Sequence, residues 1–295
     1  MQEDVFRRAF WPRWVADYWA LTKFRQTALL LVTGLAGYLS GRGRSAQPQE
    51  ALWMAAGLFF TIAGCTALNM VLDRDLDARM VRTAGRPLPA GRLRPAPAAL
   101  FGVLLSALGL FLSFTLDRRF GAVVAVGFTF DLLVYTALLK RRSALSIVFG
   151  GVAGGMPVLA GRVLALGKVD LAGLLLAASI LFWIPAHILT LALHHEEDYR
   201  RAGIPTWPGV YGPRAARLFI AVSSLLNALT LGACAIFLRL HPIPLALLLA
   251  LSLGLLGLAL QLLFRPEERR NWLLFKAASV YMLLSSILLA LGSLI

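Results

Sequence analysis

The chain has 295 residues, of which 59% are hydrophobic and only 15% are charged, against roughly 25% charged in an ordinary soluble domain. One soluble core cannot bury that much apolar surface, so the composition excludes an ordinary soluble enzyme and predicts an integral membrane protein. The formal charge of +14 does not indicate nucleic-acid binding, because the basic residues are distributed between apolar runs and form no single patch.

Nine apolar segments are long enough to cross a bilayer, and helices are the expected form because open strand edges cannot be satisfied in lipid. No linker or low-complexity tract interrupts them, so we expect one all-α integral membrane domain over residues 1–295. The expected spans are 20–41, 51–72, 98–116, 119–139, 145–166, 171–193, 215–238, 243–264 and 273–295. Glycine and proline within 150–161 favour close helix packing or a local break in a span.

Lysine and arginine gather on one side of these spans. Of the 29 basic residues, 22 lie in the N-terminal segment and in every second loop, and 7 lie in the opposite loops. The positive-inside rule therefore predicts a multi-pass protein of the inner or plasma membrane, with its N-terminus in the cytoplasm and its C-terminus on the other side.

The second span ends in a row of carboxylates, NMVLDRDLDARMVRTAGRPLPAG (69–91). Asn69, Asp73 and Asp77 are four residues apart and share one helix face, whereas Asp75 points away. Such oxygens suit Mg²⁺, which takes one or two carboxylates and completes its shell with phosphate and water. A solvated helix end is the structural alternative, but carboxylates at the end of a membrane span are costly and usually functional. Nearby cations would hold the remaining diphosphate oxygens: Lys23, Arg74, Arg82 and Arg86.

The NxxxDxxxD pattern at the end of the second span is typical of the UbiA prenyltransferases, which this chain resembles. The longer string DRDLDARMVRTAGRPLPAG (73–91) resembles the heme O synthase branch of that family, the protoheme IX farnesyltransferases. The resemblance covers roughly residues 16–215 and implies nine transmembrane helices around a central cavity, capped by two acidic cytoplasmic loops. It also implies Mg²⁺-dependent transfer of a farnesyl group from farnesyl diphosphate to heme b, giving heme O, with a heme A synthase as a downstream partner.

The segment PAHILTLALHHEEDYRRAGIPTWPGVYG resembles the second acidic loop of the same branch. The resemblance implies that Asp198 and Tyr199 belong to the site, and we expect Asp198, assisted by Glu197 or Glu196, to hold a second Mg²⁺. Many relatives have an aspartate four residues before Asp198, where this chain has His194. Because neutral imidazole is a poor Mg²⁺ ligand, we expect His194 to hydrogen-bond the diphosphate or to pair with Asp198.

A third stretch, YTALLKRRSALSIVFGGVAGGMPVLAGR (135–162), also resembles this branch. It adds candidate contacts to diphosphate or porphyrin propionates, with span anchoring as the alternative: Tyr135, Lys140 and Arg141.

Two lone polar residues lie in predicted spans. Asp131 is expected to face the central cavity or to bond a neighbouring helix. His187 is expected to ligate or stack on a heme, or to pack between helices.

The sequence leaves open both the identity of the prenyl acceptor and the class of protein. Another UbiA branch would prenylate a quinone precursor, chlorophyllide or a glycerol phosphate. A lipid-phosphate transporter would line a pathway with the same acids and bases, would need no metal, and would release the diphosphate intact.

Overall fold

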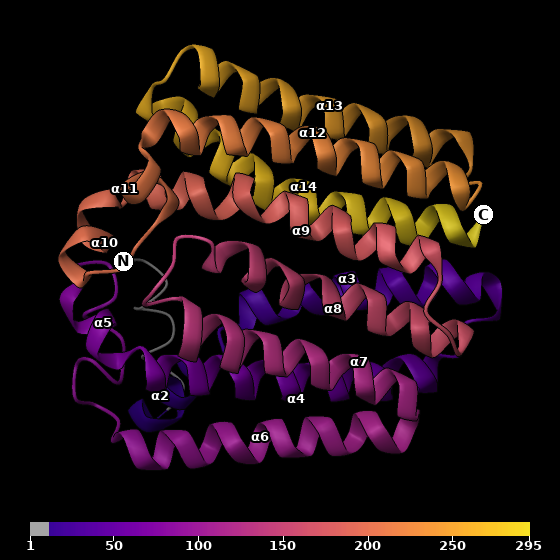
Figure 1. The fold of residues 1–295 in the computed structure, drawn as a ribbon. Helices are drawn as coiled ribbons and strands as arrows, with labels where there is room; N and C mark the ends of the chain where they lie inside the picture. The colour runs from indigo at the N-terminus through magenta and orange to yellow at the C-terminus, as the bar shows by residue number, and fades with distance from the viewer. Residues whose placement is uncertain (1–11) are drawn as a thin grey trace.

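The computed structural model describes residues 12–295, which are helical with no strand (Figure 1). The long helices are α3 (Phe24–Arg42), α4 (Pro48–Leu72), α6 (Pro95–Leu116), α7 (Arg118–Thr129) with its π-helical continuation η2 (Phe130–Leu139), α8 (Ser146–Leu166), α9 (Leu171–His194), α12 (Pro213–Phe237), α13 (Pro242–Phe264) and α14 (Glu268–Leu294). Short elements lie between them: α2 (Arg13–Leu21), η1 (Gly43–Ser45), α5 (Arg74–Arg79), α10 (Glu196–Ala202) and α11 (Trp207–Tyr211).

Each predicted span corresponds to one of these long helices or to the α7–η2 pair, which confirms the all-α membrane fold. Within residues 12–295, eight helices are long and apolar enough to cross a membrane, counting α7 and η2 as one. The remaining long helix, α3, has 19 residues and carries the polar Arg25 and Gln26 in its first turn, which lower its mean hydropathy. It begins at Phe24, later than predicted, because Lys23 takes a left-handed conformation (φ 44°) and separates α3 from α2.

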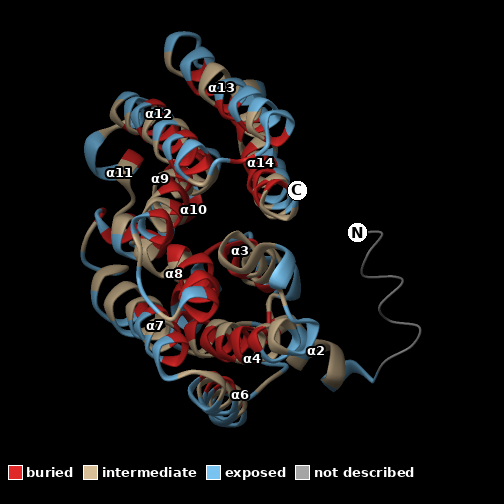
Figure 2. Ribbon diagram, turned by 90° about the vertical axis from the view of Figure 1, so that its right-hand side faces the viewer, coloured by how far each residue is buried: buried red, intermediate tan, exposed pale blue. Residues whose placement is uncertain are grey.

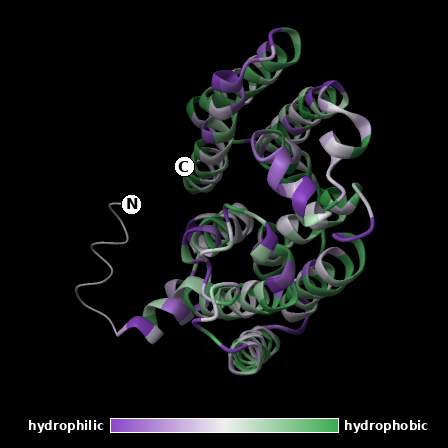
Figure 3. Ribbon diagram, turned by 90° about the vertical axis from the view of Figure 1, so that its left-hand side faces the viewer, coloured by the Kyte–Doolittle hydropathy of each residue, from purple (hydrophilic) through white to green (hydrophobic). Residues whose placement is uncertain are grey.

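The long helices run alongside one another in a bundle, with α5, α10 and α11 together at one end and the C-terminus at the other (Figure 1). The end-on view in Figure 2 shows buried residues on the inward faces of α3, α4, α8 and α9 and exposed residues around the outside. Figure 3 views the opposite end, where hydrophilic residues concentrate in the short helices and loops, and the long helices behind them are mostly hydrophobic. The fold therefore brings both acidic loops to the same end of the bundle.

The glycine-rich segment 150–161 packs closely and does not break its helix, since α8 continues through Pro157. A Cβ atom on Gly161 would lie 2.0 Å from the carbonyl oxygen of Gly34, and one on Gly37 would lie 2.0 Å from that of Val158. The backbones of α3 and α8 are thus in direct contact, which only glycine permits. This contact fixes α8 as the central helix beside the cavity.

Candidate active site

The junction between α4 and α5 presents a buried polar face. Helical hydrogen bonds continue through it, from Asp73 N to Asn69 O at 2.9 Å and from Asp77 N to Asp73 O at 2.8 Å. Asn69, Asp73 and Asp77 are all buried, whereas the side chain of Asp75 is 44% exposed. The four-residue spacing therefore places the three predicted ligands on one face, and the side chain between them points to solvent.

Cations from three separate segments reach this face. Arg86 donates two hydrogen bonds from one nitrogen to Asp77, at 2.7 and 2.9 Å, and Lys140 pairs with Asp73. Lys23 carries its charge into the same region, where burial and the neighbouring cations Arg86 and Lys140 lower its pKa to about 8. A left-handed backbone at a lysine is unusual and costs about 1–3 kcal/mol, so packing around Lys23 must enforce it.

Two oxygens on the face have no partner. Asn69 Oδ1 and Asp73 Oδ1 are buried without a hydrogen bond. The Asn69 amide is oriented by its nitrogen, which donates to Asp131 Oδ2 at 3.0 Å. Residues 12–295 contain no group of three or more His, Cys, Asp or Glu arranged to hold a metal by themselves. One amide and two carboxylates nevertheless fit Mg²⁺, which normally takes few protein ligands together with substrate phosphate.

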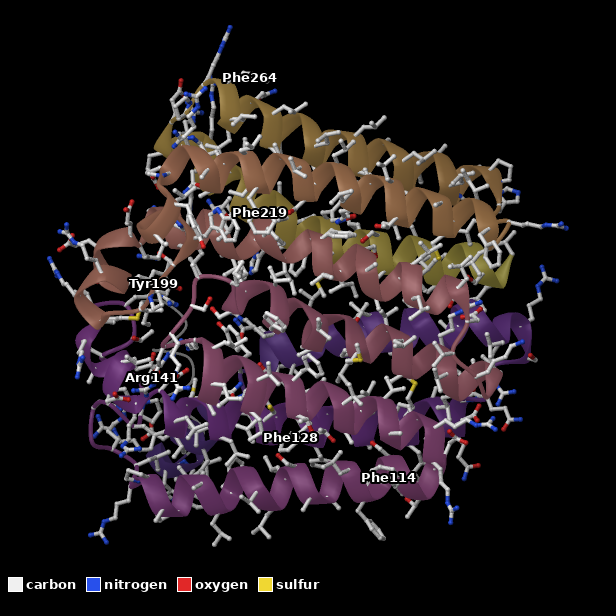
Figure 4. All side chains as sticks on the ribbon, in the orientation of Figure 1. Phe114, Phe128, Arg141, Tyr199, Phe219 and Phe264 are labelled. Atoms are coloured by element: carbon white, nitrogen blue, oxygen red, sulfur yellow. The ribbon has the colours of Figure 1, made fainter. Side chains whose placement is uncertain are left out.

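A cavity of about 310 Å³ adjoins this face inside the bundle. Its walls come from α3, α4, α7, η2, α8, α9 and α14 and are mostly apolar, with Phe128 among them (Figure 4). Asp131 and Tyr135 line the cavity at the side of the carboxylates, and Asp131 also accepts a hydrogen bond from Cys65 Sγ at 3.3 Å. Asp131 thus both faces the cavity and bonds a neighbouring helix, and it joins the apolar interior to the charged face.

The second acidic loop contacts the first through Asp198. Its carboxylate accepts hydrogen bonds from the backbone N–H groups of Val81 and Arg82, at 3.2 and 3.3 Å. This contact holds the loop that carries Arg86 against the end of the bundle. Tyr199 lies at the same end of the bundle (Figure 4).

Several predicted residues do not join the buried face. Arg74 is exposed and donates to Val71 O, and Arg82 contributes only its backbone. Glu197 is half exposed and pairs with Arg200 and Arg201 on its own helix, because its position in α10 points it outward.

Two further predicted site residues pair with carboxylates. Arg141 donates two hydrogen bonds to Asp75, at 2.6 and 2.8 Å, and these bonds lower the pKa of that carboxyl to about 2. His194 pairs with Glu268 at the start of α14. The expected pairing of His194 with Asp198 is therefore not formed, because α14 supplies a nearer carboxylate.

The contact between Asn69 and Asp131 is the feature that the sequence indicates least. A carboxylate within a span marks Asp131 as unusual. Nothing in the spacing, however, links it to a residue 62 positions earlier in the chain.

Comparisons with known proteins identify relatives along most of the chain. The UbiA prenyltransferase family model matches residues 30–287. The chain is 37% identical to a protoheme IX farnesyltransferase of Korarchaeum cryptofilum over 282 residues, which cover 95% of this chain and 92% of the relative. It is 47% identical to that of Archaeoglobus fulgidus over 196 residues, 66% of this chain and 69% of the relative.

Solved structures share the fold. A structure of digeranylgeranylglyceryl phosphate synthase aligns with a TM-score of 0.76 at 19% identity, covering 95% of this chain and 98% of that one. A UbiA homolog from Archaeoglobus fulgidus bound to GPP and Mg²⁺ aligns with a TM-score of 0.69 at 18% identity, covering 92% and 99%. With a family model spanning most of its length and such relatives, this chain belongs to the UbiA prenyltransferase family.

Proposed function

We propose that this chain transfers a farnesyl group from farnesyl diphosphate to heme b in a Mg²⁺-dependent reaction that yields heme O. The observation that carries the proposal is the buried face of carboxylates and cations at the side of an apolar cavity. Relatives that carry the name protoheme IX farnesyltransferase at up to 47% identity supply the donor and the acceptor.

The charged face is assigned to the diphosphate. Asn69 Oδ1, Asp73 and Asp77 would hold Mg²⁺ with their oxygens, two of which have no other partner. Bound Mg²⁺ neutralises negative charge that develops on the leaving diphosphate. The cations now paired with the carboxylates would then turn to the diphosphate oxygens: Lys23, Arg86 and Lys140.

The cavity is assigned to the prenyl chain and the reacting carbon. The C1–O bond of the donor breaks and its electron pair leaves with the diphosphate. The π electrons of a heme vinyl group then form the new bond to C1, and water adds to the vinyl-derived cation with loss of a proton. Apolar walls such as Leu30, Phe128 and Ile184 exclude other water, which would otherwise capture the prenyl cation.

Asp198 is assigned a positioning role, because its carboxylate holds the backbone at Val81 and Arg82. The alternative, in which Asp198 and Glu197 hold a second Mg²⁺, stays a prediction that a metal titration tests. Tyr135, next to the cavity, and Tyr199 complete the proposed site.

We further infer that residues 1–295 act as one unit in the inner or plasma membrane, with the N-terminus in the cytoplasm. The distribution of lysine and arginine supports this orientation. A heme A synthase would receive the product.

The test uses purified protein in lipid nanodiscs with farnesyl diphosphate, heme b and Mg²⁺. Mass analysis should find a hydroxyethylfarnesyl heme, and inorganic diphosphate should be released in equal amount. EDTA should stop the reaction and added Mg²⁺ should restore it. Diphosphate release with only a quinone precursor, chlorophyllide or glycerol phosphate would assign another acceptor, and intact farnesyl diphosphate throughout would refute transferase activity.

A further inference from the structure

A series of stacked rings connects α9 and α14 beside the cavity. The ring of His187 lies between Trp183, at 5.0 Å and 13°, and Phe275, at 4.7 Å and 14°. The series continues from Phe275 to Trp272 at 4.9 Å and on to His194 at 4.6 Å. Trp183 and His187 line the cavity, and the proposed transfer assigns no role to either.

The hydrogen bonds of Ser279 favour the tautomer of neutral His187 that carries its proton on Nδ1. Ser279 Oγ lies 3.2 Å from the carbonyl oxygen of Phe275, which can only accept, so the hydroxyl proton is donated there. The same oxygen lies 3.3 Å from His187 Nδ1, and we assign the proton between them to Nδ1, because the Ser279 hydroxyl then serves both contacts. In the neutral ring, Nε2 therefore keeps its lone pair.

The stacking determines which part of His187 reaches the cavity. Trp183 and Phe275 cover the two faces of the imidazole, and Ser279 engages the Nδ1 edge. His187 lines the cavity, and we assign that contact to the remaining edge, which carries Nε2. Coordination to a metal takes place in the plane of the ring, so stacking on both faces orients Nε2 without blocking it.

Because His187 offers one nitrogen ligand in an apolar wall, it can bind only a metal whose other ligands come from elsewhere. A free ion needs several ligands, and residues 12–295 hold no His, Cys, Asp and Glu cluster that would supply them. Iron in a tetrapyrrole already has four in-plane nitrogens and needs only an axial ligand. A metal-ligating histidine normally donates its other N–H to a fixed acceptor, as His187 does to Ser279.

We propose that Nε2 of His187 is an axial ligand of the heme iron and positions the acceptor ring against the wall formed by α9 and α14. The inference rests on the proposed function. The Nε2 lone pair forms the bond to iron, any water held weakly at that axial position leaves, and no electron is transferred. Ligation at this wall leaves the ring edge, with its vinyl groups, free to face the donor on the side of Asp131 and Tyr135.

Heme titrations of the purified protein in nanodiscs test the ligation by absorption and electron paramagnetic resonance spectra. The wild type should show an imidazole-ligated heme, and His187→Ala should lose that spectrum and bind heme on the order of 100-fold more weakly. Added imidazole should restore the spectrum. Ser279→Ala should weaken binding about tenfold, since it removes only the group that orients the ring. His194→Ala is the matched control and should keep the wild-type spectrum, because that ring pairs with Glu268.

Metal-free protoporphyrin IX separates ligation from packing. It lacks iron, so wild type and His187→Ala should bind it with equal affinity. An unchanged heme spectrum in His187→Ala, or an equal loss of affinity for heme and for the metal-free ring, would overturn the ligation. Turnover by the wild type is measured in parallel. Farnesylated heme formed with an unchanged His187→Ala spectrum refutes only the ligation, whereas no farnesylated heme from the wild type refutes the proposed function.

Discussion

Asp75 and Asp77 lie two residues apart in α5, and each carboxylate pairs with one arginine through two hydrogen bonds. They differ in burial, because the Asp77 side chain is 8% exposed and that of Asp75 is 44% exposed. Replacing each with asparagine removes one charge at nearly constant volume. The two variants therefore separate the buried face from an ordinary surface ion pair.

The expected losses follow from this difference. Asp77→Asn removes a proposed Mg²⁺ ligand and leaves Arg86 beside a neutral amide. Turnover should fall on the order of 100-fold or more, which corresponds to about 2.7 kcal/mol of transition-state stabilisation. The free energy of unfolding should fall by about 1.5–3 kcal/mol, the usual contribution of a hydrogen bond to a charged group. Asp75→Asn breaks an exposed pair with Arg141, so stability should change by about 0.2–1 kcal/mol and turnover by less than about twofold.

The assay is kcat/KM for farnesyl diphosphate at saturating heme, measured over a range of Mg²⁺ concentrations. Thermal melting of each variant in nanodiscs confirms that the protein assayed is folded. The Mg²⁺ concentration for half-maximal turnover should rise in Asp77→Asn and stay unchanged in Asp75→Asn. Equal losses in the two variants, or normal turnover in Asp77→Asn, would refute the assignment of the buried face.

Three further changes test other parts of the site. Lys23 is cationic below its pKa of about 8 and neutral above it, so kcat/KM should fall as pH rises through about 8. Lys23→Arg stays protonated over this range and should abolish the fall. The same alkaline fall in both proteins would contradict the role of Lys23. Asp198→Asn should raise KM for farnesyl diphosphate about tenfold or more, because the neutral amide has one acceptor oxygen and cannot accept from the N–H groups of both Val81 and Arg82. The Mg²⁺ requirement should stay unchanged, and a raised requirement would instead support the second metal site. A reporter fused after Ile295 should be active only outside the cytoplasm, and cytoplasmic activity would contradict the predicted orientation.

Much of the fold follows from local properties of the sequence. Each apolar run of about 20 residues must become a helix in lipid, so the positions of the long helices could be predicted to within a few residues. The face shared by Asn69, Asp73 and Asp77 follows from a spacing of four residues, since a helix repeats every 3.6. The exposure of Asp75 follows from the same periodicity.

The tertiary structure decided which polar groups meet. Hydropathy does not set the rotation of a helix about its axis, so the pairing of Asn69 with Asp131 and of Lys140 with Asp73 depends on packing between distant helices. The direction of Arg141 toward Asp75 and of Glu197 toward solvent depends likewise on where short helices end. Only the approach of α14 to α9 places Phe275 and Ser279 around His187. Apart from the local pairs of Glu197 within α10, these contacts arise between residues far apart in the chain, and local spacing carries no information about them.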